Sequence, residues 1–230
     1  MKFVFEKSRP SSNSCESERF VFDTIKEIKQ SFRLMMDGAV AQSMRDKGLN
    51  YHLNWGATIP RLQAKAEEIR SSFFPLPSSL YELAIALYKE NVRECKILAT
   101  MLMPPDEILP EVVDIWQEQI PSQEIAEQLA FNLYQHLPFA AEKAYQWIAS
   151  DKEYDQLCGF HVLSRLFMNG QEPNERGINE YLDQALCALQ GPYPSVRKAA
   201  LQSLQRFAEL GILYERLAKS ATKSIDLDIF

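Results

Sequence analysis

The sequence predicts an all-α protein, a right-handed solenoid of stacked helix pairs, and three observations support this fold class. Only 8 of the 230 residues are glycine, and no stretch shows the apolar–polar alternation of a half-buried strand. Hydrophobic residues make up 46% of the chain, enough to bury a sizeable core. Prolines separate apolar-periodic stretches, which is the punctuation of helix–turn–helix pairs. These prolines are Pro75, Pro77, Pro104, Pro105, Pro110, Pro121, Pro138, Pro173, Pro192 and Pro194.

The first predicted elements are a leader and a long helix. Residues 1–17 contain a polar, Ser-rich run and are expected to form a mobile leader. A helix is expected to begin at Ser17 or Glu18 and to end at Asp37-Gly38. Apolar residues recur in it at helical spacing, namely Phe20, Phe22, Ile25, Ile28 and Phe32.

A second helix is expected to close at Gly48, a residue type that favours the position after a helix end. The chain then turns at Gly56, where Thr58 can cap the next helix and Pro60 suits its first turn. The helices predicted from there on span residues 60–72, 78–88, 91–103, 106–119, 122–137, 139–150, 153–168, 174–190, 194–209 and 212–221.

Degenerate repeats distinguish a solenoid from other helical folds. Segments that start at Val92, Glu124, Tyr154 and Ser195 share small or apolar residues in the middle turn and an aliphatic stripe. Their spacing, roughly 30 to 40 residues, suits HEAT or armadillo units, in which each helix pair packs only on its neighbours. The sequence therefore predicts one HEAT-like repeat domain over residues 18–230, with a helical bundle as the alternative.

The charge of the chain is uneven. The net charge is −6, which does not favour a generic nucleic-acid binder. Residues 105–155 carry only two basic residues, Lys143 and Lys152, against eleven acids. Such an acidic block repels a phosphate backbone if its carboxylates face the ligand.

Several classes of site are not expected. The four cysteines form no CxxC pair, and three lie in apolar helical patterns, so buried reduced thiols and a cytoplasmic location are predicted. The three histidines lack metal-ligand spacing and are expected to be satisfied structural residues. No nucleotide or cofactor motif is present, and no metal, cofactor, signal peptide or membrane span is expected.

Three segments resemble a known family. They are residues 54–62, with a Gly-x-x-x-Pro-x-Leu turn, residues 88–96, with a short helix before an Arg-containing helix start, and residues 195–200, with Val-Arg-Lys-Ala-Ala. Together they look like the HEAT-like-repeat alkylpurine DNA glycosylases of the AlkD type, and the match spans most of residues 25–210.

The resemblance implies a C-shaped array whose positive concave face cradles duplex DNA. It also implies cleavage of the glycosidic bond of N3- or N7-alkylated purines by an aspartate and two tryptophans, with arginines on phosphate. A carboxylate stabilises oxocarbenium-like charge or positions water, and electron-rich indole faces favour a cationic base.

The family's site residues are replaced where they fall on this chain. Gln123 stands where the first tryptophan is expected, Glu127 at the aspartate and Gln202 at the second tryptophan. The phosphate-binding arginine falls near Gln156 or Leu157. The resemblance therefore implies a groove that has lost the aromatic platforms and an arginine, and keeps one carboxylate in longer form.

The remaining candidates have structural alternatives. Nucleic-acid contacts are proposed for Arg61, Lys89, Arg93, Lys96, Arg197 and Lys198. An arginine at the repeat positions of Arg93 and Arg197 can instead bond an acid of a neighbouring repeat. Trp55, Trp116 and Trp147 are expected in the core, with Trp55 the most exposed. Glu124 and Glu127 can share a groove or simply complement the helix dipole.

Three functions are compatible with the sequence. The first is a binding scaffold of this family that holds DNA, RNA or a protein in its groove without glycosylase activity. The second is an active alkylpurine glycosylase that uses Glu127. The third is a protein-interaction adaptor with no nucleic-acid role, which would agree with the net acidity.

Overall fold

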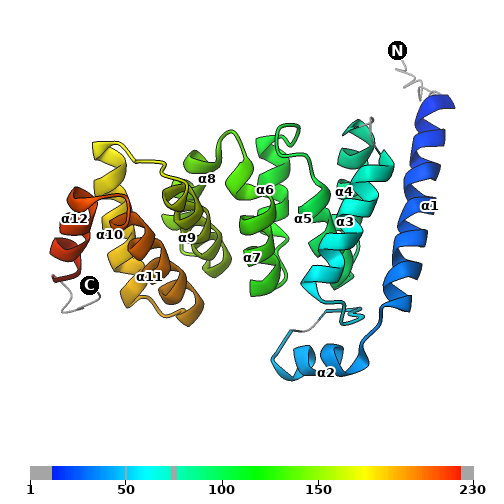
Figure 1. The fold of residues 1–230 in the computed structure, drawn as a ribbon, viewed down its shortest axis with the longest axis horizontal. Helices are drawn as coiled ribbons and strands as arrows, with labels where there is room; N and C mark the ends of the chain where they lie inside the picture. The colour runs from blue at the N-terminus through cyan, green and yellow to red at the C-terminus, as the bar shows by residue number, and fades with distance from the viewer. Residues whose placement is uncertain (1–11, 50, 74–76, 224–230) are drawn as a thin grey trace, which may run out of the picture. The chain divides into compact units, whose positions relative to one another are not determined.

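The computed structural model describes residues 12–49, 51–73 and 77–223 (Figure 1). In this part of the chain every named element is a helix, and the one β-bridge is an isolated pair, Leu53 with Val92. The chain divides into two compact units, an N-terminal unit of Met1–Met103 and a C-terminal unit of Pro104–Phe230. The all-α prediction is confirmed, whereas the single repeat domain over residues 18–230 stays a prediction.

Helix α4 is the centre of the N-terminal unit. It packs against α1, α3 and α5, and α3 also packs against α5. The apolar faces of these helices bury Ile28, Phe32, Leu62, Leu83 and Ile97 almost completely. The helices of this unit are α1 (Ser12–Leu34), α2 (Gly38–Asp46), α3 (Ile59–Phe73), α4 (Pro77–Lys89) and α5 (Arg93–Leu102).

The turn before α3 is held by its glycine. Gly56 has a φ of 75°, in the left-handed region that favours glycine. A Cβ atom there would lie 2.8 Å from the backbone nitrogen of Ala41, so a side chain would also clash with α2. The backbone N–H of Asp37 donates to the carbonyl of Trp55 at 2.8 Å, which fastens the turn to the start of α2.

The C-terminal unit consists of two helix layers. Helices α7, α9 and α11 lie side by side in that order, and α8 and α10 pack on them and on each other (Figure 1). A Cβ atom on Gly159 of α9 would lie 2.9 Å from the carbonyl oxygen of Ala144, so glycine permits the close approach of α8. The elements of this unit are α6 (Pro110–Glu118), α7 (Gln123–Asn132), η1 (Tyr134–His136), α8 (Ala140–Ile148), α9 (Glu153–Met168), α10 (Glu175–Gln190), α11 (Pro194–Ala208) and α12 (Ile212–Lys223).

Three helix boundaries differ from the prediction more than the others do. Helix α1 begins at Ser12, so residues 12–17 are helical rather than part of a mobile leader, and residues 1–11 lie outside the described chain. Helix α6 begins only at Pro110, because a proline at the first position lacks the N–H that an interior position needs. Helix α7 ends at Asn132 instead of continuing to residue 137, because the backbone of Leu133 leaves the helical region and a short 3₁₀ turn follows.

All three tryptophans of the chain are buried, which confirms that they belong to the core. Trp116 is 3% exposed and Trp147 is 6% exposed, the latter 4.8 Å from the Tyr134 ring. Trp55 is 9% exposed and packs against Phe32, with 6.0 Å between ring centroids. None of the three is therefore available as a platform on which a base could stack.

Candidate nucleic-acid interface

Helices α7, α9 and α11 carry the four positions that correspond to the family's active site. Gln123 and Glu127 lie one turn apart on α7, and the Gln123 Nε2 donates to the Glu127 Oε1 at 2.8 Å. Gln202 is exposed on α11. Because α9 packs between α7 and α11, these side chains belong to one helix layer, which we call the α7–α9–α11 face.

Gln156 has a structural role at the start of α9. Its side chain is half-buried, and its Nε2 donates to the carbonyl of Ser150 at 2.7 Å. The Ser150 hydroxyl in turn donates to Asp155 at 2.8 Å, so both side chains close the loop between α8 and α9. Leu157, the alternative position for the arginine, is 1% exposed. Neither residue can replace a phosphate-binding cation.

Gln202 borders a hollow of about 260 Å³ that sequence reasoning did not predict. Residues from all three helices of the face contribute to it. We call it the His161 hollow, and its lining consists of Phe131, His161, Ser164, Arg165, Met168, Gln202, Gln205 and Arg206. Its lining thus contains two arginines, two glutamines, a serine and a histidine, but no carboxylate.

His161 lies deep in this hollow. It is 8% exposed, its ring meets that of Phe131 edge to face at 4.9 Å, and its Nε2 has no hydrogen-bond partner. Burial, together with the charges of Arg165 and Lys198, lowers the pKa of His161 to about 4. The imidazole is therefore neutral at physiological pH. The prediction of a satisfied structural histidine is wrong, because the ring is buried but not satisfied.

Arg165 is held over the Phe131 ring, with its Cζ 4.7 Å from the ring centroid. Its described hydrogen bond goes to the Sδ of Met168, at 3.9 Å, which is a weak acceptor. Arg206, on the neighbouring helix, is paired with Glu209 at 2.6 Å. The half-buried guanidinium of Arg165 thus has no described carboxylate partner, and it is the cation of this hollow that is most available to an anion.

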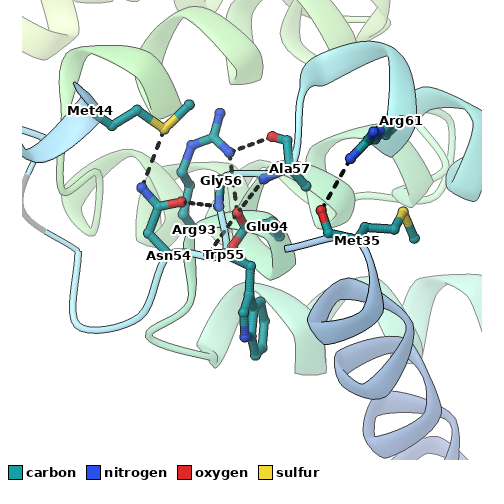
Figure 2. A network of polar contacts seen from close by, with 9 residues as sticks. All are labelled: Met35, Met44, Asn54, Trp55, Gly56, Ala57, Arg61, Arg93 and Glu94. Atoms are coloured by element: carbon teal, nitrogen blue, oxygen red, sulfur yellow. Dashed lines mark hydrogen bonds and ion pairs between the residues drawn. The ribbon is translucent and has the colours of Figure 1, made fainter. Parts of the chain in front are cut away.

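Two of the six basic candidates are buried in the N-terminal unit, which corrects their assignment to nucleic acid. Arg93 is 1% exposed and donates to the carbonyl of Ala57 at 2.8 Å and to Glu94 at 3.3 Å (Figure 2). Lys96 is 8% exposed, and its Nζ donates to the carbonyl of Tyr88 at 2.7 Å. Burial lowers the pKa of Lys96. Both side chains hold the backbone around them and cannot reach a phosphate.

Glu94 is the residue that sequence reasoning missed in this unit. Its side chain is fully buried, and its Oε1 accepts from the backbone N–H groups of Trp55 at 3.1 Å and of Ala57 at 3.2 Å (Figure 2). Arg93 therefore pairs with its neighbour on the same helix. Together the two side chains fix the turn around Gly56 to the start of α5.

The other four basic candidates lie nearer to solvent. Arg61 and Lys89 are exposed in the N-terminal unit, and Arg61 donates to the carbonyl of Met35 at 3.2 Å. In the C-terminal unit, half-buried Arg197 donates to the carbonyl of Gly191 at 2.7 Å, whereas Lys198 is exposed. Their contacts with nucleic acid stay predictions, and only Lys198 lies close enough to the hollow to influence His161.

Spacing was the signal that could have revealed the hollow. Arg165 follows His161 by four residues on α9, and Arg206 follows Gln202 by four residues on α11. Residues four apart share one side of a helix.

No described group of acidic, histidine and cysteine side chains gathers as a metal site. No helix in the described ranges is long and apolar enough to cross a membrane.

Comparisons with known proteins bear on the fold and on the family of the chain. The chain is similar, with a TM-score of 0.69 and 16% identity, to a solved structure described as a new family of proteins related to the HEAT-like repeat DNA glycosylases with affinity for branched DNA structures. The match covers 86% of this chain and 81% of the other, and it shows a HEAT-like repeat fold. A comparison with curated proteins finds no match. The sequence pattern of the DNA alkylation repair enzyme family matches residues 28–209. The chain therefore belongs to the DNA alkylation repair enzyme family.

Proposed function

We propose that this chain is a DNA-binding scaffold of its family that lacks glycosylase activity and holds DNA against the α7–α9–α11 face. The observation that carries this proposal is the lining of the His161 hollow, where Arg165 and Arg206 meet neutral polar side chains and no carboxylate. Cationic and amide donors of this kind bind phosphate oxygens. The similar structure belongs to proteins with affinity for branched DNA, so a branched duplex is the preferred test ligand.

The chemistry of the face argues against base excision. Glu127 accepts a hydrogen bond from Gln123, so its carboxylate already has a partner. No tryptophan lies on the face, because all three are in the core. Arg165 and Arg206 would also repel the positive charge of an alkylated purine in the hollow. A scaffold needs none of these catalytic groups.

The test of DNA binding is a titration of branched and linear duplexes at several salt concentrations. Arg165→Gln and Lys198→Gln are each expected to weaken binding, and each lost phosphate contact should lower the salt slope by about 0.9. Arg176→Gln is the matched control, because Arg176 borders a different hollow on α10. Equal losses in all three variants, or no salt dependence, would contradict the proposed face.

Excision is tested separately with alkylated duplex. The wild-type protein is expected to release no 7-methylguanine or 3-methyladenine. Release that Glu127→Gln abolishes would instead establish the glycosylase alternative, with Glu127 as its carboxylate.

A second hollow supports the protein-adaptor alternative. It has a volume of about 410 Å³ and lies among α8, α9 and α10, with apolar Leu163 and Leu166 beneath acidic Glu142 and Glu180. An apolar floor with a charged rim is typical of protein contacts. If the chain binds neither branched nor linear DNA, this side becomes the favoured interface. The cytoplasmic location stays a prediction in either case.

A further inference from the structure

We propose that the His161 hollow is a phosphate pocket, and that it prefers the terminal phosphomonoester of a DNA strand end to an internal phosphodiester. This inference rests on the proposed function, since it names the part of the DNA that the α7–α9–α11 face would recognise.

The hollow contains more hydrogen-bond donors than the protein uses. In the described chain, the side chains of Ser164, Gln202 and Gln205 have no hydrogen bond to another protein group, and Arg165 bonds only the Sδ of Met168. A guanidinium carries five N–H donors in a planar fork that matches two phosphate oxygens. These side chains line a space in which the described chain supplies no oxygen acceptor for Arg165.

His161 is a second, independent indication of a ligand. Its side chain is more than nine-tenths buried and belongs to the lining of the hollow, and its Nε2 has no hydrogen-bond partner within the protein. Buried polar atoms of native proteins almost always have a hydrogen-bond partner, so an orphaned atom calls for a ligand or water. A neutral imidazole with its proton on Nε2 would donate to a phosphate oxygen, and it would become more basic beside that negative charge.

The charge and shape of the hollow favour phosphate over a nucleobase. One face of the Phe131 ring is covered by the Arg165 guanidinium, and its edge contact is with His161. Stacking of a base on this ring is therefore hindered. The volume, about 260 Å³, is below the range of roughly 300–1,000 Å³ found for drug-sized ligands. A phosphate is small enough for this volume and needs no aromatic ring on which to stack.

The number of cations favours a monoester. A phosphomonoester carries nearly two negative charges near pH 7, whereas each backbone diester carries one. Arg165 and Arg206 line the hollow, and Lys198, which is outside its lining, is close enough for its charge to act on His161. Arg206 already pairs with Glu209, which leaves Arg165 as the principal anion ligand.

The first experiment follows the histidine side chains of the full-length protein by NMR during titration with inorganic phosphate. The chain has three histidines, and His161→Gln identifies the signal of interest. Phosphate is expected to shift the His161 signal saturably and to raise its pKa, and Arg165→Gln is expected to weaken this response about tenfold. No shift at His161 would overturn the pocket whether or not the protein binds DNA.

The second experiment compares one branched DNA in three forms, with 5′-phosphate ends, with 3′-phosphate ends, and with hydroxyl ends only. At least one phosphorylated form is expected to bind about tenfold more tightly than the hydroxyl form. Gln205→Glu places a carboxylate in the lining at an exposed position, so it should preserve the fold and abolish the preference. Arg176→Gln should preserve it.

The outcomes separate the two proposals. Tight binding of all three forms with the same affinity would overturn the end-recognition inference while the proposed DNA-binding function stands. No binding of any form, together with a phosphate response at His161, would instead refute the proposed function and support an anion pocket of another purpose. Thermal melting of each variant checks that a lost response is not a lost fold.

Discussion

Replacing Glu94 by glutamine removes the negative charge beside a guanidinium that is only 1% exposed. The Glu94 Oε1 accepts from Arg93 at 3.3 Å and from two backbone N–H groups, those of Trp55 and Ala57. A glutamine oxygen can keep the two backbone bonds, but buried Arg93 then loses the negative charge of Glu94. Breaking a buried ion pair from one side costs about 3–5 kcal/mol. We expect the lower end, about 3 kcal/mol, because the amide oxygen still accepts.

The assay is urea denaturation followed by circular dichroism, together with thermal melting. For a chain of this length a loss of about 3 kcal/mol corresponds to a lower melting temperature by roughly 6–12 °C. The control is Glu90→Gln, because Glu90 pairs with Lys29 at 2.7 Å and both side chains are 33% exposed. Exposed pairs contribute about 0–1 kcal/mol.

A double variant tests the cause of the loss. Arg93→Met combined with Glu94→Gln removes both charges, keeps the acceptor for Trp55 and Ala57, and replaces the guanidinium by an apolar chain. It should be more stable than Glu94→Gln alone by at least ~1 kcal/mol, since the buried guanidinium is gone as well. A single variant that costs no more than Glu90→Gln, or a double variant that loses the sum of both single effects, would refute this account.

Three further outcomes are expected. In urea denaturation, Gly56→Ala should lower the free energy of unfolding by more than ~2 kcal/mol. Gly48→Ala should lower it by about 1 kcal/mol, because Gly48 also has a positive φ but has open space where the Cβ atom would lie. The free energy of unfolding should fall by up to ~3 kcal/mol as the pH drops from about 6.5 to 4, because the imidazole of His161 takes up a proton in the unfolded chain but stays neutral when buried in the folded protein. His161→Gln should flatten this pH dependence. At pH 8, mass spectrometry should find exposed Cys187 alkylated before Cys95, since burial raises the pKa of the Cys95 thiol to about 12.

The helices could be predicted because their signals are local. Proline positions and apolar stripes indicated α9, α10 and α11 to within one or two residues. The end of α7 could not be predicted, since Leu133 leaves the helical region without a glycine or proline at that position. The early start of α1 could not be predicted either, because the polar residues from Ser12 onward carry no apolar stripe.

The site could be predicted only in part, because its geometry comes from packing between helices. The resemblance pointed to Gln202, and the structure places this residue at the hollow. The sequence left Arg93 as a nucleic-acid candidate with a structural alternative, since a sequence pattern does not distinguish an arginine on phosphate from one that holds Glu94. Phe131 and Arg165 lie on different helices, and their contact at 4.7 Å has no sequence signature.

The net charge of −6 argues against DNA binding. The distribution of charge within the C-terminal unit weakens this objection. In the acidic block, Asp114 of α6 pairs at 2.5 Å with Lys143 of α8, and α8 is not one of the helices of the α7–α9–α11 face. The lining of the His161 hollow comes from α7, α9 and α11, and its charged members are the two arginines. Exposed charges interact strongly only within about one Debye length, roughly 8–10 Å in physiological salt. A bound phosphate would therefore be governed by Arg165, by Arg206 with its partner Glu209, and by Lys198 more than by the charge of the whole chain.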